Sequence, residues 1–391
     1  MKTKINNVLK DKFFIFIVLF IFLIPHFFMT IPILNKIEHI LVLVFSVIFF
    51  ICYLRKNKIN KFIICFSAYW IFLFIISIIR DSDKIYLVYN IIKIFGLLLY
   101  VDMTMNDNKE KFLNTYAVFY TIINFINVIT ICTIFFKPDR NLYLDRIYFL
   151  GYDNDLTIIS CMSSYILLMY YELSNKNKIN FLILYSNILL YFISALMVTS
   201  ATYKISVILF LVYLILYWTK VTGKVTKIFN YYVSMILSFI FCYEVVFEKI
   251  QFKFNNIFSL FGRNASFTGR VDIWQKTLEI IKDKKAIGTG YYNFFNRKKE
   301  MGIFHAHCTL LNIGLESGII GLIIYISIFY YLGFFIKKIN NNIIKSIAIF
   351  AIFTYFLITI VEVYTDVIYF YLLIVIITNL SSKEKIKFKW I

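Results

Sequence analysis

Charged residues are scarce in this chain: they make up 16% of its 391 residues, against about a quarter in a soluble globular domain. Proline and glycine are also few, at 3 and 12 residues. In their place, 61% of the residues are hydrophobic and 20% are aromatic. This composition excludes a soluble enzyme and a nucleic-acid-binding domain, and it excludes disorder because so much apolar surface cannot stay solvated. The sequence predicts a multi-pass membrane protein.

Long apolar runs set the expected fold. A membrane-spanning helix needs about 20 predominantly apolar residues, and open sheet edges cannot lie in lipid. We expect about twelve spans, near residues 13–34, 37–54, 62–79, 85–105, 112–136, 156–171, 179–199, 204–219, 228–247, 318–336, 343–360 and 363–380. The predicted fold class is an all-α integral membrane protein.

The predicted domain organisation follows from where the polar residues interrupt these runs. Residues 1–247 contain transmembrane helices one to nine, and residues 248–317 form a large extracytoplasmic loop with amphipathic helices. Residues 318–391 contain helices ten to twelve and a basic cytoplasmic tail. The large loop is the predicted catalytic segment.

The formal net charge of +19 predicts topology and gives no sign of a nucleic-acid partner. Cytoplasmic loops carry an excess of Lys and Arg. With both termini cytoplasmic, the inner segments hold 22 of the 41 cations and six acids, a net of +16, whereas the outer segments carry a net of +2. The inner loops are short and lack a Gly-rich phosphate loop. We therefore expect a plasma-membrane protein whose chemistry occurs at the outer face, without ATP.

Six of the seven arginines, Arg263 and Arg270 among them, fall on the predicted outer side. The planar fork of arginine suits bidentate recognition of phosphate or carboxylate; chance and ordinary salt bridges are the alternative explanation. A helix predicted after Gly269 carries four apolar residues on one face: Val271, Trp274, Leu278 and Ile281. Arg270 in its first turn, with the free backbone N–H groups, would form an anion site, unless it pairs with Asp272.

Two of the four histidines, His305 and His307, are separated by a single residue at a loop-to-helix junction. Histidine is the natural general base near neutral pH. An H-x-H pair could also bind a metal, but no third ligand is placed by the sequence, and the six scattered cysteines show neither metal spacing nor a disulfide framework. We expect no cofactor and no metal.

Other candidate site residues can be explained by a structural role as well as by a functional one. Lys204, next to Tyr203, opens the eighth span, where snorkelling to the interface is the usual reason for a lysine. Gly288 and Gly290 mark the far end of the predicted outer helix. Three acids near the outer ends of the last spans either line a cavity or face water: Glu244, Glu362 and Asp366.

Three motifs in the outer loop resemble the signature region of the O-antigen ligase and Wzy polysaccharide-polymerase superfamily. They are Gly269–Arg270–x–x–Ile273–Trp274, then Ile287–Gly288–x–Gly290–x–x–x–Phe294, then Ala306–His307–x–x–Leu310–Leu311 with Leu315–Glu316–x–Gly318–Ile319–Ile320–Gly321. The chain departs from the family pattern at Cys308, where asparagine is usual. It also lacks the usual Ser-Arg pair, so that Lys204 is the nearest cation.

The resemblance implies a GT-C-like, metal-independent glycosyltransferase that uses polyprenyl-diphosphate-linked oligosaccharide as donor and acceptor. Catalysis would fall to Arg270, which binds the diphosphate with Lys204 as a second cation, and to His307 as general base. The remaining candidate substrate-binding residues are Arg263, His305, Tyr203, Gly288, Gly290 and Glu316; the last three belong to the motifs that carry the resemblance.

Within that family, we expect a polymerase of repeat units for a capsular or O-antigen-like surface polysaccharide. The composition, rich in Lys, Asn and Ile, is typical of low-GC genomes, often of Gram-positive bacteria that have no lipid A. The alternatives are an O-antigen ligase that transfers the glycan to another acceptor and a lipid-linked glycan flippase or transporter. Expected partners are the lipid bilayer, a flippase and a chain-length regulator, and no nucleic acid.

Overall fold

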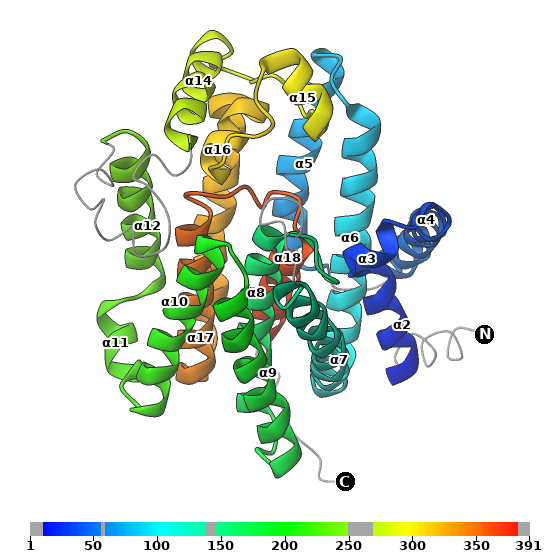
Figure 1. The fold of residues 1–391 in the computed structure, drawn as a ribbon, viewed down its shortest axis with the longest axis vertical. Coiled ribbons are helices and arrows are strands. Elements are labelled where there is room, and N and C mark those ends of the chain that lie inside the picture. The colour runs from blue at the N-terminus through cyan, green and yellow to red at the C-terminus, as the bar shows by residue number, and fades with distance from the viewer. Residues whose placement is uncertain (1–10, 56–58, 138–145, 249–268, 382–391) are drawn as a thin grey trace.

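The computed structural model describes residues 11–55, 59–137, 146–248 and 269–381. Over these ranges the chain forms helices joined by short turns, with one isolated bridge between Ile147 and Tyr152 and no strand (Figure 1). The all-α fold expected from the apolar runs is confirmed for this part of the chain.

Most of the helices run between the two ends of one bundle. Their bounds are α2 (Lys12–Phe22), α3 (His26–Met29), α4 (Pro32–Leu54), α5 (Lys61–Ile79), α6 (Lys84–Asp107), α7 (Lys109–Phe135), α8 (Asp153–Leu173), α9 (Lys178–Met197), α10 (Ala201–Trp218), α11 (Thr222–Ile228), α12 (Tyr231–Val246), α14 (Arg270–Asp283), α15 (Phe294–Met301), α16 (Thr309–Lys337), α17 (Asn342–Ile358) and α18 (Ile368–Leu380).

Among the described residues, eight helices are long and apolar enough to cross a membrane. The bent pair of α11 and α12, with 67° between its parts, makes up to nine. Three shorter apolar helices, α2, α17 and α18, account for the rest of the predicted runs. Several apolar helices therefore establish a multi-pass membrane protein, and the number of spans, about twelve, stays a prediction, as do the boundaries of the outer loop.

Two of the predicted runs are wrong in their extent. The run 13–34 is broken because α2 ends at Phe22 and α4 begins only at Pro32. Pro25, with φ −59° and ψ 140°, lies between them, and proline inside a helix removes a hydrogen bond and clashes with the preceding turn. The run 363–380 begins with a non-helical stretch, so that α18 starts at Ile368. Helix α16 begins at Thr309, but it is broken at Gly318, which is where the tenth predicted span begins.

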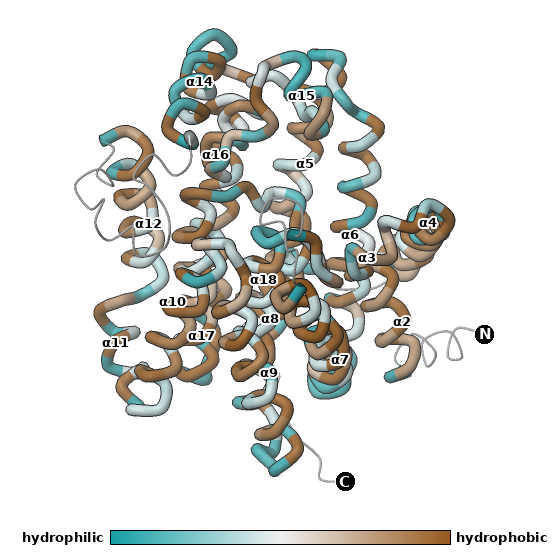
Figure 2. Tube along the Cα trace, viewed as in Figure 1, coloured by the Kyte–Doolittle hydropathy of each residue, from teal (hydrophilic) through white to brown (hydrophobic). Residues whose placement is uncertain are grey.

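Hydrogen bonds that involve polar side chains link helix ends at each of the two ends of the bundle. At one end Asn60 and Asn379 donate to Asp102 Oδ1 at 2.8 and 3.0 Å. At the other end the backbone N–H of Asn293 donates to Asp83 at 2.8 Å. Hydrophilic residues concentrate in α14, α15 and the connecting segments, whereas the helix interiors are hydrophobic (Figure 2). Segments predicted to share a side of the membrane thus contact each other.

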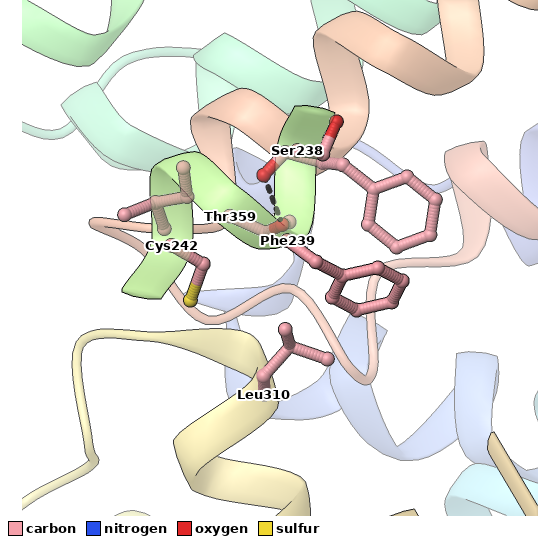
Figure 3. Close-up of a pocket in the computed structure, with 7 residues that line it drawn as sticks. Ser238, Phe239, Cys242, Leu310 and Thr359 are labelled. Carbon is pink, nitrogen blue, oxygen red and sulfur yellow. Dashed lines mark hydrogen bonds between the residues drawn. The ribbon is translucent and has the colours of Figure 1, made fainter. Parts of the chain in front are cut away.

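A small hollow lies between α12, α17 and the beginning of α16 (Figure 3). Its walls are mostly apolar and include Phe239, Leu310 and Phe356. The residues Thr359 and Ile360, which follow α17, close it on the side of the last connecting segment. The hollow therefore borders the stretch that leads into α18.

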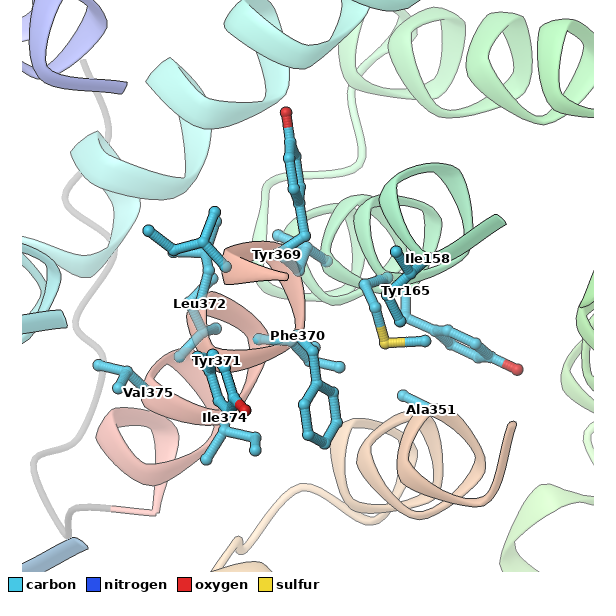
Figure 4. Close-up of a cluster of buried hydrophobic side chains, with 14 of the residues drawn as sticks. Ile158, Tyr165, Ala351, Tyr369, Phe370, Tyr371, Leu372, Ile374 and Val375 are labelled. Carbon is cyan, nitrogen blue, oxygen red and sulfur yellow. The ribbon is translucent and has the colours of Figure 1, made fainter. Parts of the chain in front are cut away.

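Helix α18 lies at the centre of the bundle, and each of its residues is buried. Figure 4 shows Phe370 of α18 on the side of Tyr165 of α8 and Ala351 of α17, whereas Leu372 points to the opposite side of α18. Hydroxyl groups also join these helices, as hydrogen bonds between helices do in membrane proteins; the Tyr165 hydroxyl lies 2.9 Å from Thr354 Oγ1. Because α18 is packed on all sides, it fixes the position of residues 359–367, the segment that leads into it.

Helix α16 is broken at Gly318, which has φ 65° and ψ −168°. This conformation is essentially restricted to glycine. A Cβ atom added there would lie 2.4 Å from the Ala286 carbonyl oxygen and 2.6 Å from the Ile287 nitrogen. The break therefore depends on glycine and lets the loop after α14 lie against α16.

We expect Gly318→Ala to destabilise the protein by about 3 kcal/mol, because the new methyl group meets backbone atoms and the dihedral angles are unfavourable. Thermal unfolding of the detergent-solubilised protein measures the effect. Gly223→Ala is the matched control, since a Cβ atom added to Gly223 in α11 would have no atom within 4 Å. Equal melting temperatures for the two variants would contradict the assignment.

Candidate functional site

Helix α14 forms where its apolar spacing predicts it, with Gly269 as N-cap at φ 85°. Val271 and Trp274 are buried, and they pack with Ala306, Cys308 and Leu311 at the beginning of α16. The Trp274 indole donates to the His307 carbonyl at 3.4 Å. The amphipathic face thus fixes α14 against the segment that carries the histidine pair, and Arg270 becomes the first residue of the helix.

Arg270 turns into the protein and binds the segment before α18. Its Nη2 lies 2.6 Å from Glu362 Oε1, and its Nη1 donates to the Val361 carbonyl. The exposed fractions of the two charged side chains are 17% for Arg270 and 4% for Glu362. The carboxylate partner of Arg270 is thus Glu362, whereas Asp272 is exposed.

His307 reaches the same carboxylate from the other side. Its Nδ1 lies 3.9 Å from Glu362 Oε2, which is within ion-pair distance and too long for a hydrogen bond. The backbone of His307 has φ 48°, an uncommon conformation for a residue with a side chain. Its N–H donates to His305 Nδ1 at 3.2 Å, and the two rings lie 3.8 Å apart. Arg270, Glu362 and His307 therefore form one cluster.

The charge of Glu362 is set by two opposing effects. Burial raises the pKa of its carboxyl, but the charge of Arg270 and the contact with His307 lower it, and the net pKa is below the ordinary value. Glu362 is therefore ionised near neutral pH. A buried carboxylate thus binds the guanidinium of Arg270 and lies within ion-pair distance of the His307 imidazole.

Thr309 fixes the distance between His307 and Glu362. Its backbone N–H donates to the Thr359 carbonyl at 2.9 Å, and its hydroxyl donates to the Glu362 carbonyl at 3.0 Å. The same hydroxyl accepts from the Tyr364 N–H at 3.2 Å. Three hydrogen bonds therefore tie the beginning of α16 to the segment that leads into α18.

The first turns of α8 and α10 adjoin this cluster. The Tyr364 hydroxyl donates to the Asn154 carbonyl at 2.8 Å, and Asn154 Oδ1 accepts from the Ser200 hydroxyl at 2.9 Å. The Thr199 hydroxyl donates to Asp153. The site is thus assembled from segments near residues 153, 200, 270, 307 and 362.

The comparison with protein families falls on this part of the chain. Residues 184–326 match the family model described as O-Antigen ligase. Residues 184–326 are therefore similar to the O-antigen ligase family, and we call them the O-antigen ligase region below. The resemblance to the O-antigen ligase and Wzy superfamily is thereby confirmed. No curated protein and no solved structure matches the chain.

The O-antigen ligase region includes α14 and the histidine pair, and it ends before Glu362. The sequence identifies Glu362 only as one of several acids near outer helix ends. In the sequence, Glu362 is visible as an acidic residue between two predicted spans, 343–360 and 363–380. This position does not reveal the partners, because Glu362 and Arg270 are 92 residues apart.

Lys204 lies in the first turn of α10, one turn after Ser200, and is partly exposed. Tyr203 is 1% exposed and packs its ring against Tyr191, with 5.3 Å between the ring centroids. Arg263 lies outside the described residues. Substrate binding by these three residues stays a prediction.

Glu316 belongs to a second buried cluster in the O-antigen ligase region. Its Oε1 pairs with Arg297 Nη2 and accepts from the Asn312 amide at 2.9 Å. Arg297 also donates to the Tyr292 carbonyl at 2.9 Å. These contacts hold α15 against α16, and they give Glu316 a structural explanation beside its predicted role in substrate binding.

Gly288 and Gly290 also have internal contacts. Both have left-handed backbone angles, with φ 70° and 83°. A Cβ on Gly288 would lie 2.6 Å from the Gly318 nitrogen, and one on Gly290 would lie 2.4 Å from the Ser82 hydroxyl. Glycine allows this close backbone approach. The loop after α14 can therefore pack directly on the break in α16.

His305 gives the site a pH-dependent contribution to stability. Burial, followed by the charge of His307, lowers the pKa of His305 from 6.5 to about 3. Below pH 6.5 the unfolded chain therefore binds a proton at this residue that the folded chain does not bind. The contribution of His305 to the free energy of unfolding thus falls as the pH decreases from 6.5 toward 3.

We expect His305→Gln to lose less thermal stability than the wild type on acidification from about pH 7 to pH 4. Melting temperatures in detergent at several pH values measure this difference. His39→Gln is the control, since it changes a histidine of α4 outside the site. Parallel losses in the wild type and His305→Gln would show that His305 is not buried as a neutral ring.

Proposed function

We propose that this protein is a metal-independent glycosyltransferase that polymerises polyprenyl-diphosphate-linked repeat units at the outer face of the plasma membrane. Both termini are then cytoplasmic. The observation that carries the proposal is the convergence of Arg270 and His307 on Glu362, at 2.6 and 3.9 Å, within and beside the region that matches the O-antigen ligase family.

The reaction needs positive charge where the leaving group develops negative charge. When the acceptor hydroxyl attacks the anomeric carbon, the bond between that carbon and the diphosphate oxygen breaks, and its electron pair leaves with the polyprenyl diphosphate. Fixed donors aimed at developing charge are usually the largest catalytic contribution. Arg270 fits this role because Val361 and Glu362 use two of its five N–H donors. The others can bind a phosphate oxygen, with Lys204 as a second cation.

The reaction also needs a base for the proton of the acceptor hydroxyl. His307 is 24% exposed, whereas Glu362 is 4% exposed, so that the imidazole is the more accessible of the two groups. The negative charge of Glu362 stabilises the imidazolium that forms when His307 takes the proton. Glu362 is then a positioning residue that serves both the base and the diphosphate-binding arginine.

The geometry fits an enzyme better than a flippase. The polar cluster lies at the end of the bundle, where α14 and α16 meet the segment before α18. The cation Lys93, deeper in the bundle, is paired with Glu38 at 2.6 Å. A flippase needs a polar path through the membrane, and a paired cation does not provide one by itself.

Deleting the gene tests the function and separates the alternatives. A polymerase leaves single lipid-linked repeats on the outer leaflet of the membrane. A ligase leaves long lipid-linked chains that are not transferred, and a flippase leaves single repeats on the inner leaflet. The first result supports the proposal, and either of the others overturns it. A flippase and a chain-length regulator would then be the partners in the same membrane.

A further inference from the structure

Two cysteines from distant parts of the chain meet beside the candidate site. The sulfur atoms of Cys242 and Cys308 lie 3.9 Å apart. Cys242 is in the last two turns of α12, and Cys308 directly follows His307 and is the N-cap of α16. Both side chains are buried, with exposed fractions of 8% and 0%.

The other four cysteines have different surroundings. Cys52, Cys65, Cys132 and Cys161 lie within apolar helices, and all six cysteines are thiols in this structure. Cys132 contacts a methionine sulfur, that of Met197, at 3.6 Å. Cys242 and Cys308 are thus set apart because two thiols contact each other and because they lie at the end of the bundle.

The geometry requires little movement for a bond to form. A disulfide bond is about 2.05 Å long, so each sulfur has to move by about 1 Å. Cys242 lines the hollow between α12, α16 and α17, and Figure 3 shows it on the wall of that hollow. Cys242 therefore borders a small open space, whereas Cys308 is fully buried.

The predicted topology places both thiols on the outer side of the membrane. Disulfides form and persist in oxidising extracytoplasmic surroundings and are rare in the cytosol. This step rests on the outward orientation of the proposed function, and it does not rest on the transfer chemistry. If the orientation were reversed, both thiols would stay reduced.

We propose that Cys242 and Cys308 are a redox-active pair that forms a disulfide by thiol–disulfide exchange with an extracytoplasmic disulfide. One thiolate attacks the oxidant RS–SR and releases one RS⁻, which gives a mixed disulfide. The second thiolate attacks that bond and releases the other RS⁻. The two cysteines lose two protons and two electrons, and the oxidant becomes two thiols.

The disulfide would stabilise the segment between residues 242 and 308, which contains both candidate catalytic residues. Cys242 and Cys308 are 66 residues apart, and the loop between them carries Arg270 and Trp274. Closing such a loop restricts the unfolded chain and stabilises the folded one. It also fastens the residue next to His307 to α12. The redox state of this pair therefore sets the thermal stability of the segment that holds both candidate catalytic residues.

Mass spectrometry of the full-length protein tests the proposal. Protein purified from aerobic cells without reductant is alkylated with N-ethylmaleimide under denaturing conditions and digested. We expect a linked peptide pair that contains Cys242 and Cys308, which disappears on reduction, while Cys161 is alkylated. In Cys242→Ser and in Cys308→Ser the remaining partner should be alkylated as a free thiol, and Cys161→Ser should leave the linked pair unchanged.

A second measurement applies if the purified protein has both cysteines reduced. Oxidised glutathione is added to the purified wild type, and the melting temperature is compared with that of Cys242→Ser. We expect oxidation to raise the melting temperature of the wild type alone. Alkylation of both cysteines after glutathione treatment would overturn the proposal. Neither readout uses transferase activity, so failure here is distinct from failure of the proposed function.

Discussion

Arg270→Gln is expected to lower the rate of glycan transfer by about 10²–10³-fold, the usual effect of removing one fixed donor to a developing negative charge. The variant keeps an amide that can still contact Glu362, but it loses the positive charge and most of the donors. The transfer rate is measured with purified protein and a polyprenyl-diphosphate-linked repeat unit as substrate. Arg270→Lys should retain part of the activity, because it keeps the charge without the planar fork.

The buried pair with Glu362 makes a control for stability necessary. Removing one partner of a buried ion pair costs about 3–5 kcal/mol, so that Arg270→Gln could lose activity through unfolding. The double variant Arg270→Gln with Glu362→Gln removes both charges and should recover most of the melting temperature. Its activity should stay low. Recovery of activity together with stability would show that Arg270 has only a structural role.

His307→Asn is expected to lower the transfer rate by about 10²–10⁴-fold, the range for loss of a general base. Asparagine is the suitable replacement because it tolerates left-handed backbone angles better than most residues, and His307 has φ 48°. The backbone and its contacts with Trp274 and His305 should therefore persist. The same transfer assay measures the rate.

His305→Gln is the matched control for the second histidine. With its pKa lowered to about 3, His305 stays neutral over the working range, and it lies beside His307 without an ion-pair contact to Glu362. Because His305 is also a candidate substrate-binding residue, we expect His305→Gln to lose less transfer activity than His307→Asn, and not to keep all of it. A transfer rate for His307→Asn within about threefold of the wild type, with a normal melting temperature, would contradict general-base catalysis by His307.

The sequence predicts the helices well because the bilayer imposes a simple rule. The spacing of Val271, Trp274, Leu278 and Ile281 also predicts helix α14, because these residues form the face that packs. The extent of the first run is harder to predict, because one proline decides where α2 and α4 separate. The break in α16 at Gly318 depends on a loop from another part of the chain, which a local pattern does not contain.

In the candidate site too, residues of a local motif can be predicted from the sequence, whereas contacts between distant segments cannot. Arg270 and His307 are identified by residue type and position in the outer segment. Their common partner Glu362 lies beyond the next two helices in the sequence, and its role depends on the hydrogen bonds of Thr309. Gly288 shows why a motif does not reveal its role. A glycine is required both where backbone approaches a ligand and where backbone approaches backbone.

The most direct test of the central claim is the product balance of the purified protein in lipid vesicles. The substrate is a polyprenyl-diphosphate-linked repeat unit without any other acceptor. We expect longer lipid-linked glycan and free polyprenyl diphosphate, with one molecule of polyprenyl diphosphate released for each new glycosidic bond. Unchanged substrate, or its movement across the bilayer without release of polyprenyl diphosphate, would contradict it.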